Sequence, residues 1–193
     1  INLKGEKLSK ATGVTIDPIA LAKKYSVDSM RYFLIREIPF GEDGEFSELA
    51  LVERHNGELV NKLGNLVSRV AALIEKYGME KTTLLDSKKV YKMVGECIEN
   101  FKFDKALQEI FSFIDQCNAF VQEKKLWETK DPKALYQLAN AIKDIAILLI
   151  PFMPETSEKI ANIFSFDISL DIFGKGLAIT KIKKPAPLFE KIK

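Results

Sequence analysis

Hydrophobic residues recur every three or four positions over most of the chain, which is the spacing of an amphipathic helix. In the longest such stretch the apolar stripe is Leu59, Leu63, Leu66, Val70 and Ile74. Strand-like alternation is scarce. The pattern predicts an all-α fold, a helical bundle with helices near 18–25, 28–36, 47–77, 87–101, 104–124, 132–150 and 154–164.

Prolines, caps and glycines mark the ends of these helices. Asp17-Pro18 and Asp131-Pro132 each place an acidic cap before a proline, which suits the first helical position because that N–H has no partner within the helix. Gly78 predicts the end of the longest helix. Gly57 and Gly64 lie inside that helix at a cost of about 1 kcal/mol each, which predicts close approach of another backbone.

The ends of the chain are less helical than its middle, and this divides it into three parts. Residues 1–45 combine a lysine-rich loop with short helices, and 46–165 form the predicted bundle. Residues 166–193 form an extended tail in which 168–172 and 177–182 have the composition of short strands.

Composition limits the chemistry that the chain can support. It has 193 residues, 47% hydrophobic and 29% charged, which excludes the disordered and collagen-like classes. Lys+Arg total 29 against 27 Asp+Glu, so any contact with nucleic acid has to be local or driven by shape rather than by a broad positive surface. The most apolar run, 145–153, is far shorter than the roughly 20 residues of a membrane span. We expect a cytoplasmic protein with no membrane partner.

One histidine, His55, and two cysteines, Cys97 and Cys117, are too few for a Cys/His zinc site. Both cysteines fall at apolar helical positions, where they are expected to be buried. The acidic residues between Gly41 and Leu59 are interpreted as complements of helix dipoles rather than as metal ligands. We expect no metal site, and we interpret His55 as an ordinary polar position on the longest helix.

A loop near the N-terminus is the first candidate for chemistry. Lys7-Leu8-Ser9-Lys10-Ala11 places two lysines three positions apart around a serine. Their mobile ammonium groups can converge on a polyphosphate, and nearby glycines let the loop close over it. A solvated charged loop is the alternative that the residues leave open.

The polar face of the longest helix is the second candidate. At about 100° per residue, Asn61, Asn65, Ser68 and Arg69 fall opposite the apolar stripe. Bases of a single-stranded RNA loop are recognised by stacking on aromatic or guanidinium groups and by hydrogen bonds to their edges. Asn65, Arg69 and the lone tryptophan Trp127 supply these groups. The alternatives are a solvated helix face and a packing role for Trp127.

The segment 7–11 resembles the KMSKS signature of the class I aminoacyl-tRNA synthetases, with Leu8 in place of methionine and Ala11 in place of the last serine. In that class the lysines of the loop neutralise charge that builds on the phosphates of ATP. The resemblance therefore implies contact with ATP, bound as Mg-ATP in the whole enzyme, by Lys7, Ser9 and Lys10.

Three further segments, 36–47, 61–69 and 184–192, are similar to the methionyl-tRNA synthetase family. The resemblance covers nearly the whole chain and implies the C-terminal part of that enzyme. Its parts would be the signature loop with a stem-contact segment in 1–45, a helical anticodon-binding domain in 46–165, and a linker back toward the catalytic domain in 166–193.

The family recognises the CAU anticodon of tRNA(Met), which implies this role for Asn65, Arg69 and Trp127. Leu126 stands where the family usually has a proline. The second class I signature, HIGH, needs two histidines, and the chain has only His55. We therefore expect a fragment without the catalytic fold, inactive in adenylation, whose partners are the anticodon loop and the catalytic domain of the parent chain, but not DNA.

Two alternatives stay open. The chain could be a fragment of another class I synthetase, of the leucine or cysteine type, or a helical adaptor that binds no RNA. A preference among anticodon stem-loops separates the synthetases from one another. Unchanged fluorescence of Trp127 on addition of RNA would indicate the adaptor.

Overall fold

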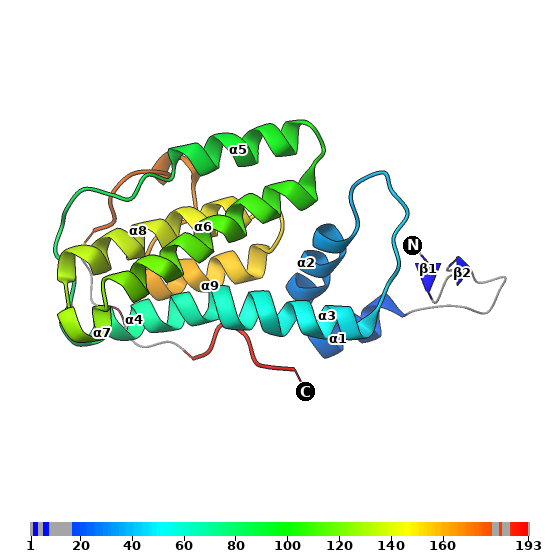
Figure 1. Cartoon of the computed structure of the whole chain (residues 1–193), viewed down its shortest axis with the longest axis horizontal. Helices are drawn as coiled ribbons and strands as arrows, with labels where there is room; N and C mark the ends of the chain where they lie inside the picture. The colour runs from blue at the N-terminus through cyan, green and yellow to red at the C-terminus, as the bar shows by residue number, and fades with distance from the viewer. Residues whose placement is uncertain (1, 4–5, 8–16, 179–181, 183–185, 193) are drawn as a thin grey trace.

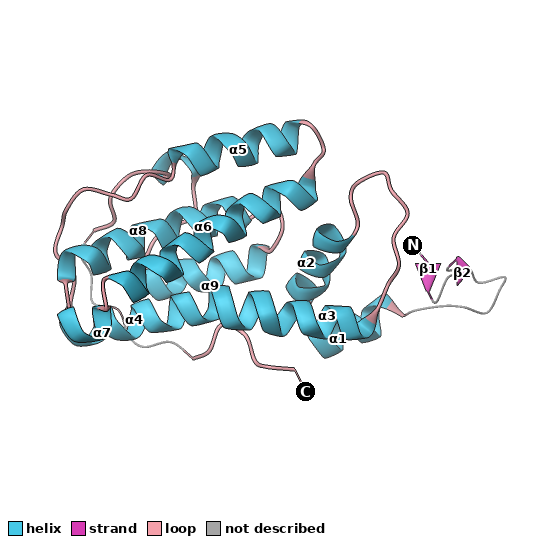
Figure 2. Cartoon of the chain, viewed as in Figure 1, coloured by secondary structure: helices cyan, strands magenta, loops and turns pink. Residues whose placement is uncertain are grey.

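The computed structural model describes residues 2–3, 6–7, 17–178, 182 and 186–192. Regular structure in these residues is helical, apart from an antiparallel pair of two-residue strands, so the predicted all-α fold is confirmed (Figures 1 and 2). The elements are β1 (Asn2–Leu3), β2 (Glu6–Lys7), α1 (Pro18–Tyr25), α2 (Val27–Glu37), α3 (Glu48–Arg54), the π-helical segment η2 (His55–Gly64), α4 (Asn65–Tyr77), α5 (Lys88–Glu99), α6 (Phe103–Glu123), α7 (Leu126–Thr129), α8 (Pro132–Leu149), α9 (Pro154–Phe164) and the 3-10 helix η3 (Leu170–Ile172).

The helix α8 lies at the centre of the bundle, between α4, α6 and α9 (Figure 1). Nearly all of its residues are buried, because its apolar side chains face every direction rather than one stripe. Asp131 caps it as predicted, accepting hydrogen bonds from the backbone N–H groups of Lys133 and Ala134. Neither α8 nor any other described helix is long and apolar enough to cross a membrane.

The predicted helix over 47–77 is one continuous rod made of α3, η2 and α4, and we call it the long helix (Figure 1). The five residues of its predicted apolar stripe are all buried. A Cβ at Gly64 would lie 3.1 Å from the carbonyl oxygen of Leu59 and 3.4 Å from Cδ2 of Phe189, so the close neighbour from outside the helix is a side chain rather than a backbone. A Cβ at Gly57 would meet no neighbouring atom of the described residues within 4 Å, so the expected close approach there was wrong.

The first helices dock onto the bundle through long-range hydrogen bonds. Oδ2 of the buried Asp28 on α2 accepts the backbone N–H of Thr156 at 2.6 Å and so caps the start of α9. Nε of Arg31 donates to the carbonyl oxygen of Phe152 at 2.8 Å. A second small core joins α1, α2 and α3, and so includes residues on both sides of the boundary predicted after residue 45. The domain boundaries predicted from the sequence stay a prediction.

The strand expected at 168–172 is wrong, because Leu170–Ile172 form the 3-10 helix η3. The buried ion pair of Lys143 and Asp144 on α8 forms hydrogen bonds to the backbone of this segment. Nζ of Lys143 donates to the carbonyl oxygen of Ile172 at 2.7 Å, and Oδ1 of Asp144 accepts the N–H of Gly174 at 3.0 Å. In the second expected strand, 177, 178 and 182 are irregular, and 179–181 lie outside the described residues.

Both cysteines occupy the apolar positions expected of them. Cys117 is buried in the main core, and burial raises its pKa to about 12, so the thiol stays protonated. Cys97 is partly buried against the same core.

Replacing Asp144 by Ala is expected to destabilise the fold by about 3–5 kcal/mol, because it leaves the buried Lys143 ammonium without its counter-charge. The two groups are 2.9 Å apart and almost completely buried. Urea unfolding followed by circular dichroism measures the change. The control is Lys92→Ala, which removes an exposed pair with Glu96 and should change the unfolding free energy by less than about 1 kcal/mol. Equal effects of the two substitutions would contradict the assignment.

Candidate RNA interface

Four polar side chains of the long helix, Asn61, Asn65, Ser68 and Arg69, form what we call the amide face. Asn61 and Asn65 are exposed, and Ser68 and Arg69 are half-buried. Their neighbours Asn56 and Lys62 bond to Ile192 and Asp115, whereas the four have no side-chain hydrogen bond to another described residue. Their donors and acceptors are therefore available to a ligand.

Trp127 lies on α7 and is 44% exposed, which contradicts a packing role for it. Its Nε1 donates to Oε1 of Glu128 at 3.2 Å. The preceding Leu126, which stands where the resemblance implies a proline, is fully buried and anchors the turn. Left-handed residues on both sides of α7, Lys125 with φ 44° and Lys130 with φ 54°, keep it short and orient it.

The three predicted RNA-binding residues lie toward opposite ends of α4, two on α4 itself and Trp127 on α7. Asn65 and Arg69 lie one turn apart near its beginning, and α7 lies beside its other end (Figure 1). There Nζ of Lys130 is 5.6 Å from the ring centroid of Tyr77. At 1.5 Å per residue the helix from Asn65 to Tyr77 is about 18 Å long. Among the described residues, no hydrogen bond joins Trp127 to Asn65 or Arg69.

The end of the chain lies against the long helix, and His55 holds it there. The ring is buried, with Nδ1 3.0 Å from Oγ of Ser29 and Nε2 2.9 Å from the carbonyl oxygen of Glu190. The ring of Phe189 packs edge-on against it, with the centroids 5.9 Å apart. The interpretation of His55 as an ordinary polar position was therefore wrong.

Asn56 adds two hydrogen bonds to the same contact. Its Nδ2 donates to the carbonyl oxygen of Ile192 at 2.8 Å, and its Oδ1 accepts the N–H of Ile192 at 2.9 Å. We call residues 186–192 the docked tail. Sequence analysis missed His55 and Asn56 because their partners lie far along the chain, although the apolar pair Leu188 and Phe189 in a polar tail could have indicated a buried contact.

Burial lowers the pKa of His55 below its usual 6.5, although the Glu190 carbonyl opposes this shift. The ring is therefore neutral at pH 7. As a neutral ring it donates Nε2–H to Glu190 and accepts the hydroxyl proton of Ser29 at Nδ1, so both of its nitrogens are satisfied.

The stability that neutral His55 supplies is expected to disappear in acid. Because its folded pKa lies below its unfolded one, the unfolded chain takes up the proton first as the pH falls. This contribution is complete above about pH 6.5 and is lost as the pH falls from there toward the folded pKa. Urea unfolding from about pH 5 to 8 should show the wild type losing stability relative to His55→Gln in this window. Parallel pH profiles would contradict it.

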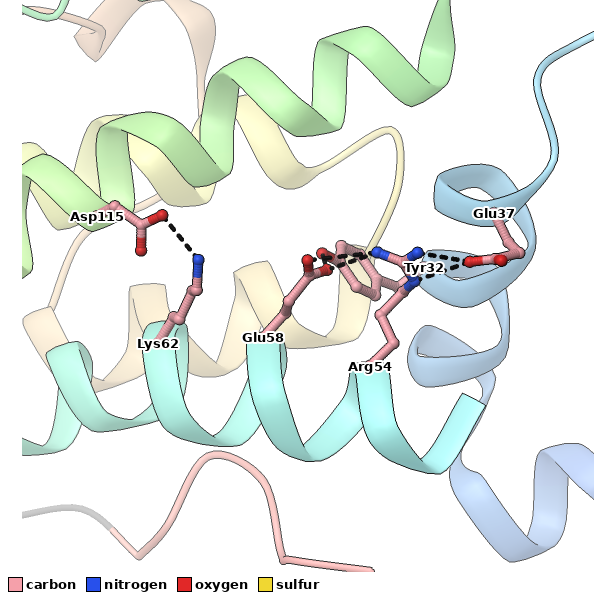
Figure 3. A network of polar contacts seen from close by, with 6 residues as sticks. All are labelled: Tyr32, Glu37, Arg54, Glu58, Lys62 and Asp115. Carbon is pink, nitrogen blue, oxygen red and sulfur yellow. Dashed lines mark hydrogen bonds and ion pairs between the residues drawn. The ribbon is translucent and has the colours of Figure 1, made fainter. Parts of the chain in front are cut away.

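Two of the acidic residues between Gly41 and Leu59, Glu48 and Glu58, have different environments. Glu48 lies in the first turn of α3, as expected for a dipole complement. Glu58 instead accepts a hydrogen bond from the buried Tyr32 and pairs with Arg54 at 3.3 Å (Figure 3). Among the described residues, no group of three or more His, Cys, Asp and Glu side chains is arranged to hold a metal ion.

Figure 3 also shows the ion pairs that Arg54 and Lys62 of the long helix form with acidic residues. Arg54 reaches Glu37 on α2, and Nζ of Lys62 pairs with Asp115 on α6 at 2.7 Å. Burial raises the pKa of Tyr32, and Glu58 raises it further, so the phenol keeps its proton. Arg54 and Lys62 are thus paired with carboxylates of the protein. Arg69 is the one charged residue of the amide face.

The predicted ATP-binding residues are described only in part. Lys7 ends the strand β2, and Ser9 and Lys10 lie outside the described residues. Their contact with ATP phosphates stays a prediction.

Two family models match nearly the whole chain. Residues 1–71 match the model described as tRNA synthetases class I (M), and residues 80–188 match the anticodon-binding domain of tRNA ligase. The chain belongs to the methionyl-tRNA synthetase family. The amide face lies inside the first match, close to its end, and Trp127 lies inside the second.

Individual members of the methionyl-tRNA synthetase family agree with this assignment. The methionine–tRNA ligase of Halalkalibacterium halodurans is 36% identical over 98% of this chain and 33% of its own length, and that of Bacillus subtilis is 33% identical over 98% and 33%. The chain thus spans about a third of the length of these relatives. The structure of Mycobacterium tuberculosis methionyl-tRNA synthetase in complex with methionyl-adenylate matches with a TM-score of 0.87 and 28% identity, over 97% of this chain and 42% of that one. The leucine-type, cysteine-type and adaptor alternatives are not favoured.

Proposed function

We propose that this chain binds the anticodon loop of tRNA(Met) through Asn65, Arg69 and Trp127. The observation that carries the proposal is that Asn65 and Arg69 lie one turn apart on the same helix. Both side chains project from one helix, and neither has a partner among the described residues. They belong to a chain whose residues 80–188 match an anticodon-binding domain.

The chemistry of these groups suits unpaired bases. An amide both donates and accepts, and so complements the edge of a base, while a guanidinium plane and an indole ring each offer a stacking surface. The roughly 18 Å from the start of α4 to its end is long enough for several nucleotides of an open loop. Because Arg69 is the single charge of the amide face, we attribute recognition there to hydrogen bonds and stacking rather than to a field of positive charge.

We also propose that the parent protein joins methionine to tRNA(Met) with ATP in the cytoplasm. Lys7, Ser9 and Lys10 would act on the ATP phosphates there, next to a catalytic domain that carries the other signature. The chain alone is expected to be inactive, since it contains only one of the two signatures of the class.

Replacing Trp127 by Ala should weaken binding of a CAU anticodon stem-loop by about 1–3 kcal/mol, because a base loses its stacking surface. Fluorescence anisotropy of an end-labelled stem-loop measures this, and the lone tryptophan of the wild type gives an independent signal. The control is Phe40→Ala, an exposed aromatic in the loop between α2 and α3. Equal affinities of the Trp127 variant and the wild type would contradict stacking.

Replacing Arg69 by Ala should cost a similar amount, and Arg69→Lys separates charge from shape. Lysine keeps the positive charge but lacks the planar fork that stacks and bonds in two places. We expect Arg69→Lys to recover less than half of the lost binding free energy in the same anisotropy assay. If Arg69→Lys recovered all of the lost binding free energy, the role of Arg69 would be a charge contact with phosphate instead of stacking.

A further inference from the structure

A groove runs between the long helix and the docked tail, directly beside Asn65. Its volume is about 550 Å³, within the range of roughly 300–1,000 Å³ that is typical of small-molecule sites. One wall is polar and the other is apolar. The polar wall is Asn61, Asn65 and Ser68, and the apolar wall is Pro187, Leu188 and Phe189.

The two walls match the two surfaces of a nucleobase. A base has a flat face that stacks on apolar or aromatic groups and an edge of donors and acceptors that an amide can bond. Asn61 and Asn65 are one helical turn apart, so their Cβ atoms are about 5–6 Å apart and both amides can reach one ring. Neither amide has another partner among the described residues, so both are available to a base.

The groove suits an uncharged ligand better than a phosphate. No charged side chain is among the described residues that line it. A separate hollow between α1, α9 and the docked tail, of about 500 Å³, has the opposite character, because charged residues line it: Lys23, Lys24, Lys159 and Lys191 together with Asp28, Glu155 and Glu190. Charged partners for a phosphate are therefore present in the second hollow, whereas an uncharged ring suits the first.

The apolar wall is held in place before any ligand arrives. His55 and Asn56 fix the backbone of Glu190 and Ile192, and Phe189 packs over Gly64. A preformed slot loses less conformational entropy on binding than a tail that has to be ordered first.

We infer that this groove receives one unstacked base of the bound RNA loop, and that Asn61 is a further residue that determines which base is accepted. This inference rests on the proposed function. It adds one residue on the long helix and gives the docked tail a place in recognition.

A double-mutant cycle tests the inference. The cycle compares the whole chain with its Asn61→Ala variant. Each protein is titrated with a CAU stem-loop and with a series of stem-loops in which one loop base at a time has been removed. Asn61→Ala should weaken binding of the intact loop about 10-fold, as expected for the loss of a good amide–base contact. For the one loop that lacks the base held in the groove, the same substitution should change affinity by less than about twofold.

Two matched variants complete the test. Asn162→Ala, an exposed asparagine of α9, should bind every loop as the wild type does. Phe189→Leu keeps the apolar contact over Gly64 but removes the ring, and it should lose affinity for every loop except the one that Asn61→Ala also spares. Urea midpoints check that each variant is folded.

The outcomes separate the groove from the proposed function. If Asn61→Ala binds like the wild type, or weakens every loop by the same factor, the inference is overturned while the roles of Asn65, Arg69 and Trp127 stand. If the wild type itself does not prefer the CAU loop over a loop with a permuted anticodon, the proposed function fails and the inference fails with it.

Discussion

The hydrogen bonds from His55 and Asn56 to the end of the chain organise the surface that we propose binds RNA. They hold the backbone of Glu190 and Ile192 on the long helix and so bring Phe189 over Gly64. Without this contact the helix would present a convex row of amides to solvent. With it, the same amides form one wall of a groove, which can surround a base on more than one side.

A second constraint is the pairing of charges inside the protein. Arg54 binds Glu37 and Glu58, and Lys62 binds Asp115, so these cations are not available to RNA. An amide face with one charge limits non-specific attraction to phosphate there and leaves discrimination to amides, a guanidinium and an indole. This arrangement is consistent with the small net charge of +2 for the whole chain.

The helices could be predicted because their information is local. The 3.6-residue period and caps such as Asp131 place them within a few residues of their observed ends. The 3-10 helix at Leu170–Ile172 could not, because it depends on Lys143 and Asp144, which belong to a different helix. The alternation of apolar residues there indicates a strand only where a neighbouring strand is present to accept its hydrogen bonds.

The candidate site divides in the same way. Asn65, Arg69 and Trp127 could be named from the sequence because a helical face and a resemblance both point to them. The role of His55 could not, because its partners Ser29 and Glu190 are 26 and 135 positions away. The groove was missed for the same reason, since one of its walls comes from the other end of the chain.

RNA binding at the groove is tested most directly by an NMR titration of the isotope-labelled chain with the CAU stem-loop. We expect the side-chain amide signals of Asn61 and Asn65, the indole signal of Trp127 and the ring signals of Phe189 to shift together and to saturate at one equivalent. The amide signal of Asn162, on α9, should stay in place. If the RNA shifted other signals but left those of the long helix and the docked tail unchanged, binding at the groove would be contradicted, whatever the measured affinity.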